Sequence, residues 1–478
     1  MSGRRRGSAS AAWVSTLVLV SVAWATTAQA ASATVQNATE LTAAIAAAGP
    51  GDTITLLDGS FLVSTPILAS AAGSVNAPIR VTSAHGAHGA IIVAGAGADA
   101  AVRVSGPFWI FDGVDFDGAT YGVRVVAGGN DVVIANARVR GTVAGVRADC
   151  GGPDSAAHCD RGTLNGVDVT GSATTPGCSF AGVEIVGGVD WRVRGSSVHD
   201  VVVDTLSCPV ATSYGIVARG NAQRLTVESV RVAGVGIGLA LGPGSDPCEV
   251  RGTTQNGTSC TAATACAAQT STLRNVVVHD TTDVGVLLQN ACGVNVHGAT
   301  LWNDGTAANG KRSVESRATG ASDVSDTILN GPIVVGVGTM VTGGGNLTLP
   351  TGNEPSWFLD AAGGNFRLAD LSPAIDTGVA LGDLPFDYDG LGRPQGSAFD
   401  VGAFERPTGG YPDGGLPMTD GGTDGAVGPG GATGGLGGGG TAPPKGGCQC
   451  TLSGGNLDAL APLLLLLLAL LLLARRRV

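Results

Sequence analysis

Residues 132–140 read VVIANARVR and contain a pattern that returns along most of the chain. Ile134 and Val139 are five residues apart, and the polar Asn136 lies between them. Such spacing fits two short strands that meet at a tight bend, each of which points one apolar side chain toward the same interior. The run therefore predicts a bent pair of strands with one buried side.

Outward from this run, apolar pairs with the same spacing recur along the chain. The pairs are Phe111/Phe116, Ile134/Val139, Leu164/Val169, Val193/Val198, Val227/Val232, Leu273/Val278, Val296/Leu301 and Val324/Leu329. A small or polar residue lies within most pairs: Asn136, Gly166, Ser196, Ser229, Asn275 and Gly298. The longer units also contain a second recurring apolar position, directly after a glycine, at Gly122-Val123, Gly182-Val183, Gly215-Ile216 and Gly285-Val286. The shortest separation of successive pairs is 23 residues, which matches one coil of a three-sided β-helix.

Stacked coils would bury continuous ladders of Val, Ile and Leu that no single coil can bury alone. The sequence therefore predicts an all-β protein, a right-handed parallel β-helix. An antiparallel sandwich would show hairpin signals between neighbouring strands, and a leucine-rich solenoid would show closer leucine spacing. Residues 38–48 depart from the strand pattern, because Leu41, Ile45 and Ala48 share one helical face, and they predict a short N-terminal capping helix.

The two ends of the chain have the composition of targeting segments. Arg4, Arg5 and Arg6 precede an apolar run and a small-residue site, which predicts a secretory signal peptide cut after Ala30; an uncleaved N-terminal anchor is the alternative. Near the other end, an apolar run from Leu460 to Ala474 is followed by three arginines. This run is short for a bilayer span, but flanking arginines can snorkel and would remain cytoplasmic. We therefore expect an exported protein anchored in the cell envelope.

These boundaries divide the chain into five parts. They are a signal peptide (1–30), a β-helix with its cap (31–346), a C-terminal segment that closes the β-helix (347–405), a Gly/Pro-rich tether (406–447) and a sorting tail with a transmembrane helix (448–478). Without the signal and the residues after Cys450, 21 basic and 37 acidic residues remain. Such an acidic body argues against nucleic acid as a partner.

Four successive coils are longer than the 23-residue minimum. Their extra residues fall within 145–162, 170–181, 200–214 and 240–271. Because all of this excess lies outside the five-spaced pairs, we expect one wall of loops on a single side, the usual binding face of a solenoid.

Seven of the eight cysteines of the body fall in these loops, and the eighth lies on the following coil. They are Cys150, Cys159, Cys178, Cys208, Cys248, Cys260, Cys266 and Cys292. An even number of cysteines in an exported chain predicts disulfides, and the paired C-x-x-C spacing of zinc sites is absent. The expected bridges are Cys150–Cys159, Cys178–Cys208 and two among the remaining four cysteines.

Three stretches resemble known families. The runs VQNATELTAAIAAAGPGDTITLLDGSF, NAPIRVTS and FWIFDGVDFDG, within 35–118, resemble the start of chondroitinase-B-like and alginate-lyase-like β-helices of the pectate-lyase-like superfamily. Residues 371–405 resemble the end of surface β-helix proteins of the choice-of-anchor Q type. The tail GGCQCTLSGG, with the leucine run and terminal arginines, is similar to the MYXO-CTERM sorting signal, which implies a sorting protease that cuts near Cys448 or Cys450; a plain C-terminal membrane anchor is the alternative.

Catalysis needs a site as well as a fold. A β-eliminating lyase must neutralise a uronate carboxylate, for which its relatives use calcium or basic residues, and remove the α-proton, for which they use a Lys or Arg. The only lysine of the body is Lys311, which no lyase motif surrounds and which fits a solvated loop. A glycoside hydrolase needs converging carboxylates. The loops offer Asp149, Asp154, Asp160, Asp200, Asp204, Asp246 and Glu249. Convergence of Asp160, Asp200 and Asp204 with Arg161 or Arg219 would favour an enzyme.

Other polar motifs have simpler interpretations. The polygalacturonase signature is missing, and His199-Asp200 and His279-Asp280 occupy the same position of the repeat. Asp387 and Asp389 form a D-x-D-G that fits a turn and leaves calcium as the one cofactor to consider. The hypothesis from the sequence is a surface-anchored β-helix that is structural or contacts glycans through its loops. A polysaccharide lyase or glycoside hydrolase with a divergent site is the alternative.

Overall fold

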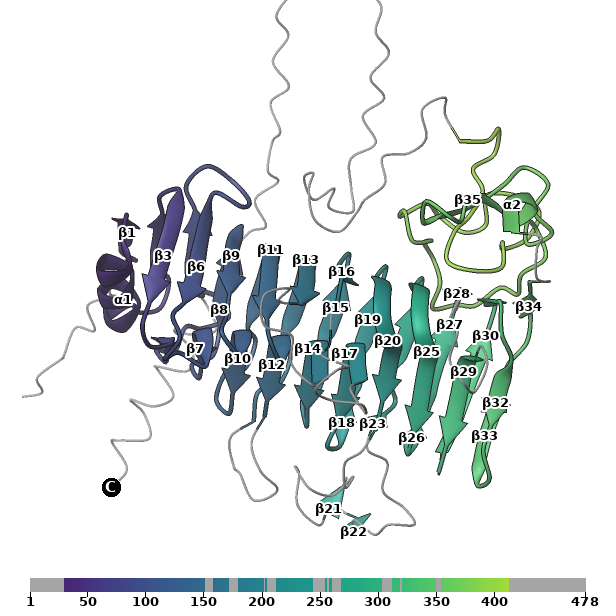
Figure 1. Cartoon of the computed structure of the whole chain (residues 1–478), viewed down its shortest axis with the longest axis horizontal. Coiled ribbons are helices and arrows are strands. Elements are labelled where there is room, and N and C mark those ends of the chain that lie inside the picture. The colour runs from purple at the N-terminus through teal and green to yellow at the C-terminus, as the bar shows by residue number, and fades with distance from the viewer. Residues whose placement is uncertain are drawn as a thin grey trace, which may run out of the picture. The chain divides into compact units, whose positions relative to one another are not determined.

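The computed structural model describes residues 30–150, 158–171, 179–201, 203, 212–243, 254–255, 258–259, 268–302, 312–318, 320–349 and 354–411. These residues form a right-handed parallel β-helix, in which strands of successive coils lie side by side (Figure 1). The predicted fold class is confirmed. Residues 1–29 and 412–478, and with them Cys448, Cys450 and the leucine run, lie outside the described residues. Within the described part, no helix has the length and apolar character needed to cross a membrane.

Three parallel ladders of strands form the coil. The first sheet contains β1 (Ser32–Val35), β2 (Thr53–Leu56), β5 (Ile79–Ser83), β8 (Trp109–Asp112), the first halves of β11 (Val133–Gly141) and β13 (Thr163–Gly171), β15 (Arg192–Arg194), β19 (Thr226–Glu228), β24 (Thr272–Arg274), β27 (Val294–His297), β30 (Gly320–Ser325) and β33 (Thr339–Thr342). The second sheet contains β3 (Gly59–Val63), β6 (Ala90–Ala94), β9 (Val114–Asp117), the second halves of β11 and β13, β16 (Ser197–His199), the first halves of β20 (Arg231–Leu241) and β25 (Val277–Gln289), β28 (Thr300–Trp302), β31 (Ile328–Leu329) and β34 (Leu347–Thr348). The third sheet contains β4 (Ile67–Ala69), β7 (Ala100–Val104), β10 (Tyr121–Val126), β12 (Ala144–Asp149), β14 (Ser179–Val186), β17 (Thr212–Arg219), the second halves of β20 and β25, β29 (Arg312–Arg317) and β32 (Ile333–Val335).

Smaller elements complete the described structure. They are a parallel group of β18 (Ala222–Gln223), β23 (Ala268–Gln269) and β26 (Ala291–Cys292), an antiparallel pair of β21 (Thr254–Gln255) and β22 (Thr258–Ser259), an antiparallel pair of β35 (Phe358–Asp360) and β36 (Asn365–Leu368), and the helices α1 (Ala38–Ala47) and α2 (Glu354–Trp357).

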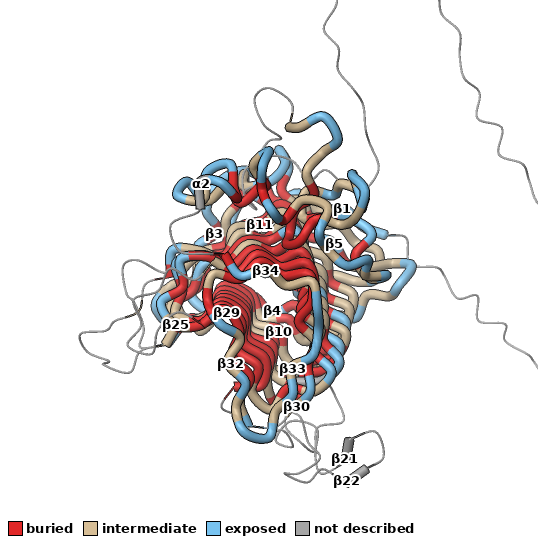
Figure 2. Tube along the Cα trace, turned by 90° about the vertical axis from the view of Figure 1, so that its right-hand side faces the viewer, coloured by how far each residue is buried: buried red, intermediate tan, exposed pale blue. Residues whose placement is uncertain are grey.

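The five-spaced pairs form two continuous ladders of buried side chains. The first members, from Phe111 to Val324, are register partners from coil to coil in the first sheet. The second members, from Phe116 to Leu329, are register partners in the second sheet. The Gly-Val column forms the ladder of the third sheet, in which Val146 and Leu239 fill the coils that the sequence pattern had missed. The interior is therefore one core that runs through all coils (Figure 2).

In each of the eight coils that carry a five-spaced pair, the bend between the first two sheets places one residue in the left-handed region. These residues are Gly113, Asn136, Gly166, Gly195, Ser229, Asn275, Gly298 and Asp326. Glycine and asparagine tolerate this conformation, which explains the polar break inside the pairs. In the coil of Val193, Gly195 adopts the conformation in place of the expected Ser196.

Helix α1 covers the first coil, as predicted. Asn37 accepts a hydrogen bond from the backbone N–H of Glu40, and Glu40 accepts one from the N–H of Gln36, which satisfies the helix N-terminus. Leu41 and Ile45 are buried against the coil. The apolar face of α1 thus covers the core at the N-terminal end of the β-helix.

The C-terminal segment packs against the outer face of the second sheet near the last coils. A second apolar cluster joins Phe358, Phe366 and Phe404 to Val277 and Ile328 of the coil. The sequence predicted that this segment, residues 347–405, closes the end of the β-helix; it supplies β34 to the last coil and packs its remaining described part on the flank, and the closing role stays a prediction.

The expected single wall of loops is wrong. Residues 151–157 and 244–253 follow strands of the third sheet, β12 and the second half of β20. Residues 172–178 and 204–211 follow strands of the second sheet, β13 and β16. The extra residues therefore leave the coil at two different corners.

Candidate functional site

The described members of the predicted catalytic group do not converge. Asp160 lies in the corner before β13 and accepts a hydrogen bond from the N–H of Val189 at 3.0 Å. Asp200 follows β16 in the second sheet, where its side chain is 84% exposed and contacts the neighbouring His199. Arg219 ends β17 in the third sheet and pairs with Glu184.

The other members of that prediction give no support to a shared cleft. Arg161 is engaged by both carboxylate oxygens of Asp131, each at 2.7 Å. The separation of the candidates follows from the two corners at which the loops leave the coil. The remaining candidates lie outside the described residues: Asp154, Asp204, Asp246, Glu249 and Lys311.

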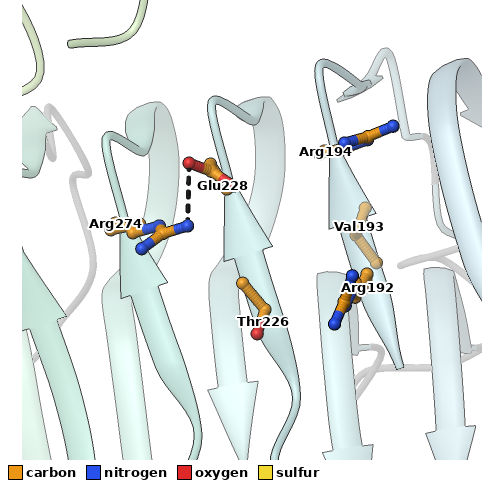
Figure 3. A pocket seen from close by; sticks show the side chains of 6 residues that line it. All are labelled: Arg192, Val193, Arg194, Thr226, Glu228 and Arg274. Atoms are coloured by element: carbon orange, nitrogen blue, oxygen red, sulfur yellow. Dashed lines mark ion pairs between the residues drawn. The ribbon is translucent and has the colours of Figure 1, made fainter. Parts of the chain in front are cut away.

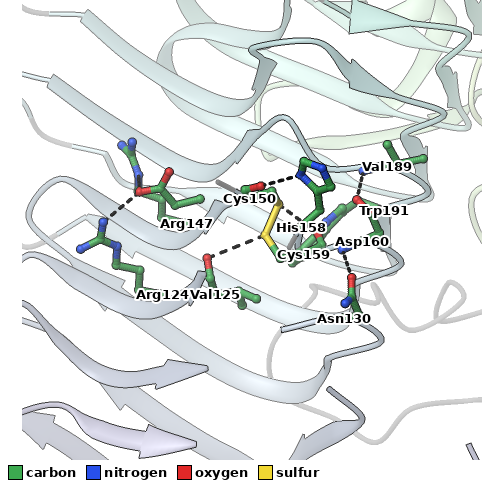
Figure 4. The surroundings of a disulfide bond; sticks show 11 residues. Arg124, Val125, Asn130, Arg147, Cys150, His158, Cys159, Asp160, Val189 and Trp191 are labelled. Atoms are coloured by element: carbon green, nitrogen blue, oxygen red, sulfur yellow. Dashed lines mark hydrogen bonds and ion pairs between the residues drawn. A yellow bond between two sulfur atoms is a disulfide. The ribbon is translucent and has the colours of Figure 1, made fainter. Parts of the chain in front are cut away.

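The predicted disulfide between Cys150 and Cys159 is present (Figure 4). It joins the end of β12 to the corner that leads into the next coil, where the indole N–H of Trp191 donates to the carbonyl of Cys159 at 2.7 Å. Both cysteines are buried, so this bridge fixes a corner of the scaffold. Cys292 is also disulfide-bonded. The other expected cysteines, Cys178, Cys208, Cys248, Cys260 and Cys266, lie outside the described residues.

An ion-pair ladder runs along the outer face of the third sheet. Its members are Arg103, Asp99, Arg124, Asp149, Arg147, Glu184 and Arg219, joined in this order. Each of its carboxylates contacts two arginines, and the Arg124 and Arg147 guanidinium groups also lie 5.4 and 5.7 Å from the ring centre of Tyr121. Burial opposes ionisation of Asp99, but the hydrogen bonds from Arg103 and Arg124 outweigh it and lower its pKa. The ladder is thus a set of mutually satisfied charges.

A shallow groove with a different charge balance lies on the outer face of the first sheet (Figure 3). We call it the arginine groove, and it is lined by Arg192, Val193, Arg194, Thr226, Glu228 and Arg274. Three consecutive strands, β15, β19 and β24, supply these residues. Its lining contains three arginines and one carboxylate, so this spot is positive within an acidic protein.

The register of the strands explains why these side chains share one face. Arg194, Glu228 and Arg274 are register partners on successive coils, about 4.8 Å apart. Arg192 and Arg194 flank the buried Val193, and residues on either side of an inward-pointing side chain point outward. The groove therefore follows directly from the core ladder.

The arginines of the groove differ in how far protein groups hold them. Arg274 pairs with Glu228 at 3.0 Å and donates to the carbonyl of Asp383 in the C-terminal segment at 2.7 Å. Within the described part of the chain, Arg194 donates only through Nε, to the amide oxygen of Asn165 at 3.0 Å. Among the described residues, none forms an ion pair or hydrogen bond with the exposed guanidinium of Arg192. Two exposed guanidinium groups are thus available to an anionic ligand beside a third that is fixed.

The sequence interpretation overlooked these arginines, although a signal was present. The five-spaced pairs identify Val193, Val227 and Leu273 as inward-pointing, so their direct neighbours must face outward. Reading the neighbours across coils would have aligned Arg194 with Arg274.

The histidines at equivalent repeat positions have opposite environments. The hydrogen bond with Asp168, assisted by Asp200, raises the pKa of His199 to about 9. Burial and the neighbouring Arg231 lower the pKa of His279, whose Nε2 accepts from Arg231 at 2.9 Å. The register confirms that both belong to one column of the second sheet. Their different partners indicate structural roles that vary from coil to coil.

The D-x-D-G motif forms a turn. Asp387 accepts hydrogen bonds from the N–H groups of Leu391 and Glu405, and Asp389 pairs with Arg367 at 2.7 and 2.8 Å. Burial raises the pKa of Asp387 to about 7. In the described part of the chain, no group of three or more His, Cys, Asp or Glu side chains is arranged to hold a metal ion.

Comparison with known proteins identifies the fold and finds no close relative in sequence. No protein-family model and no curated protein matches the sequence. The pectate lyase Pel9A is similar over 79% of this chain and 96% of its own, with 16% identity and a TM-score of 0.53. An alginate lyase from Paenibacillus sp. str. FPU-7 is similar over 66% of this chain and 99% of its own, with 15% identity and a TM-score of 0.46. The chain therefore shares the parallel β-helix fold of the pectate lyase Pel9A, and the likeness concerns the fold alone.

Proposed function

We propose that this protein is an exported, envelope-anchored β-helix that binds an acidic polysaccharide in the arginine groove. The observation that carries the proposal is the exposed pair Arg192 and Arg194 beside the fixed Arg274. Guanidinium groups bind carboxylates and sulfates with paired hydrogen bonds. Export and anchoring rest on the segments 1–30 and 448–478 of the sequence.

The groove suits an extended glycan because its positive groups repeat with the coils. Neighbouring coils are about 4.8 Å apart, which is close to the length of one sugar along a chain. A glycan lying along the helix axis would pass Arg194, Glu228 and Arg274 in turn. The acidic rest of the body would repel the same glycan, which restricts binding to this place.

Binding without cleavage is the function that the lining supports best. Glu228 is the one carboxylate that lines the groove, and Arg274 engages it. A hydrolase needs two carboxylates that flank the scissile bond, and a lyase needs a base beside the neutralising cations. The groove offers a single carboxylate, which is already paired, and its candidate bases are arginines, which are protonated near neutral pH.

The test measures binding of the purified full-length protein in detergent to immobilised polygalacturonate, with neutral dextran as reference. We expect binding to polygalacturonate that weakens with salt, because exposed charges are screened. Arg192→Gln or Arg194→Gln should weaken it about tenfold. Arg140→Gln is the matched control, since Arg140 is also exposed and donates to one neutral acceptor, Thr170.

Loss of binding in Arg140→Gln to the same extent, or unchanged binding in both groove variants, would contradict the proposal. The same incubations distinguish the enzymatic alternative. Absorbance from unsaturated uronate products would establish a lyase, and new reducing ends without that absorbance would establish a hydrolase. Either product would replace the binding function with catalysis.

A further inference from the structure

We infer that Asp383 of the C-terminal segment ends the glycan site of the arginine groove and thereby limits the length of acidic glycan that the site binds. The inference rests on the proposed function, because it concerns the same groove. The observation that carries it is the contact of Asp383 with Arg274, the last arginine of the groove, and with His297 on the following coil.

The outward row of the groove continues one coil beyond its lining. The register partner of Arg274 on the next coil is His297, in β27. A histidine ring also offers N–H groups to an anion, so this position would lengthen the groove by one coil, about 4.8 Å. His297 is only 8% exposed, however. The next position that an acidic glycan would reach is therefore already covered.

Asp383 contacts both residues at this end of the groove. Its backbone carbonyl accepts a hydrogen bond from Nη1 of Arg274 at 2.7 Å, and its carboxylate oxygens lie 2.9 and 3.1 Å from Nδ1 of His297. The other ring nitrogen of His297 lies 3.1 Å from a carboxylate oxygen of Asp323. Two carboxylates thus lie where the row of cations would continue, and their charge repels the acidic units of a glycan at this point.

Contacts other than the Asp383 carboxylate also hold this part of the C-terminal segment in place. Asn275 donates from its side-chain amide to the carbonyl of Phe386 at 2.7 Å. Leu384 is fully buried, and it lies so close to Gly298 that a Cβ at Gly298 would come within 2.9 Å of its side chain. Neutralising Asp383 should therefore remove its charge and leave the backbone around it where it is.

Binding of oligogalacturonates of defined length to the full-length protein in detergent tests the inference. Asp383→Asn should raise the affinity for an octamer about threefold, because the octamer no longer meets this carboxylate beside Arg274. A dimer should bind wild type and variant equally, because it fits beside Arg192 and Arg194 at the other end of the groove. Asp280→Asn is the matched control and should change neither affinity. It makes the same change in net charge and also breaks an Asp–His pair, of 2.7 Å, but on the second sheet.

A substitution of His297 separates the charge of Asp383 from a merely structural role. His297→Gln breaks the same contact but retains the Asp383 carboxylate, so it should give no gain in affinity for the octamer. A gain as large as that of Asp383→Asn would overturn the inference, and so would an equal gain of Asp383→Asn for dimer and octamer. Asp383→Ser, a second neutral substitution, should behave like Asp383→Asn and replaces it if that variant does not fold by circular dichroism.

Failure of this inference is distinguishable from failure of the proposed function. A wild type that binds neither polygalacturonate nor the octamer contradicts the proposed function and the inference with it. A wild type that binds both, together with an Asp383→Asn variant that binds the octamer no better than Asp280→Asn does, overturns this inference alone.

Discussion

The arginine groove and the ion-pair ladder use the same residue type on two faces of one coil stack. In the ladder, each carboxylate is shared by two arginines, and Glu184 is almost buried between Arg147 and Arg219. In the groove, the one carboxylate pairs with Arg274 alone, and Arg192 and Arg194 remain exposed. The comparison shows that the number of outward-facing arginines on a sheet does not indicate the function of that face. The balance between cations and internal acceptors decides whether a row of charges holds the scaffold or binds a ligand.

The largest expected effect comes from removing an acceptor of the ladder. Glu184→Gln leaves Arg147 and Arg219 without their anion in a partly buried place. The free energy of unfolding should fall by about 2 kcal/mol, less than for a fully buried pair because both arginines retain solvent contact. Urea denaturation measures the change. Glu228→Gln is the matched control and should cost less than about 0.5 kcal/mol, since its pair with Arg274 is partly exposed to solvent. Equal losses of unfolding free energy in the two variants would contradict the proposed difference between the ladder and the groove.

A smaller effect, a gain in ligand affinity, is expected when the groove loses its one carboxylate. Glu228→Gln removes the one negative charge of the lining and frees one side of Arg274. Affinity for polygalacturonate should rise about threefold, because the ligand no longer competes with Glu228. Titration by biolayer interferometry measures this. A loss of affinity would show that the Glu228 carboxylate itself contacts the sugar, and Glu184→Gln should leave affinity unchanged.

The smallest expected effect is the pH dependence of the ladder. Arg103 and Arg124 lower the pKa of Asp99 in the folded protein despite its partial burial. The stabilisation is therefore complete above the ordinary aspartate pKa of about 3.9 and disappears as the pH falls through the lower folded value. Asp99→Asn should melt about 1–2 °C below the wild type at pH 7 and together with it at the acid end. Differential scanning fluorimetry across pH 7 to about 2 checks the convergence. A constant difference would assign the effect to packing.

The buried ladders could be predicted because inward positions carry a strong signal. Ile134, Val139 and their partners repeat with a fixed spacing, and the side-chain period of strands fixes the register. The third ladder was only partly recognised, because Val146 and Leu239 lie in less regular runs. Without those two positions, the sequence could not show whether the extra residues of a coil precede or follow its strand in the third sheet. That omission produced the wrong expectation of one loop wall.

The groove was harder to predict because pairing across coils depends on geometry that composition does not contain. Arg194 and Arg274 are two coils apart in the sequence, with a long insertion between them, yet they occupy one register position. The insertion increases the number of residues between successive pairs and leaves the strand register unchanged, because the buried core residues determine how the coils stack. Whether each guanidinium finds an acceptor then depends on single neighbours such as Asn165, Glu228 and Asp383. A sequence pattern contains no information on such contacts.

The N-terminal cap has a consequence for how the protein is made. Helix α1 belongs to the part of the chain that is synthesised first, and it can cover the first coil as soon as that coil forms. Each coil pairs chiefly with the one before it, which lets every new strand add to an edge that is already formed. Assembly can then follow synthesis in one direction, with the growing edge always at the youngest coil. Folding in this order would make the capped first coil the template for the coils that follow.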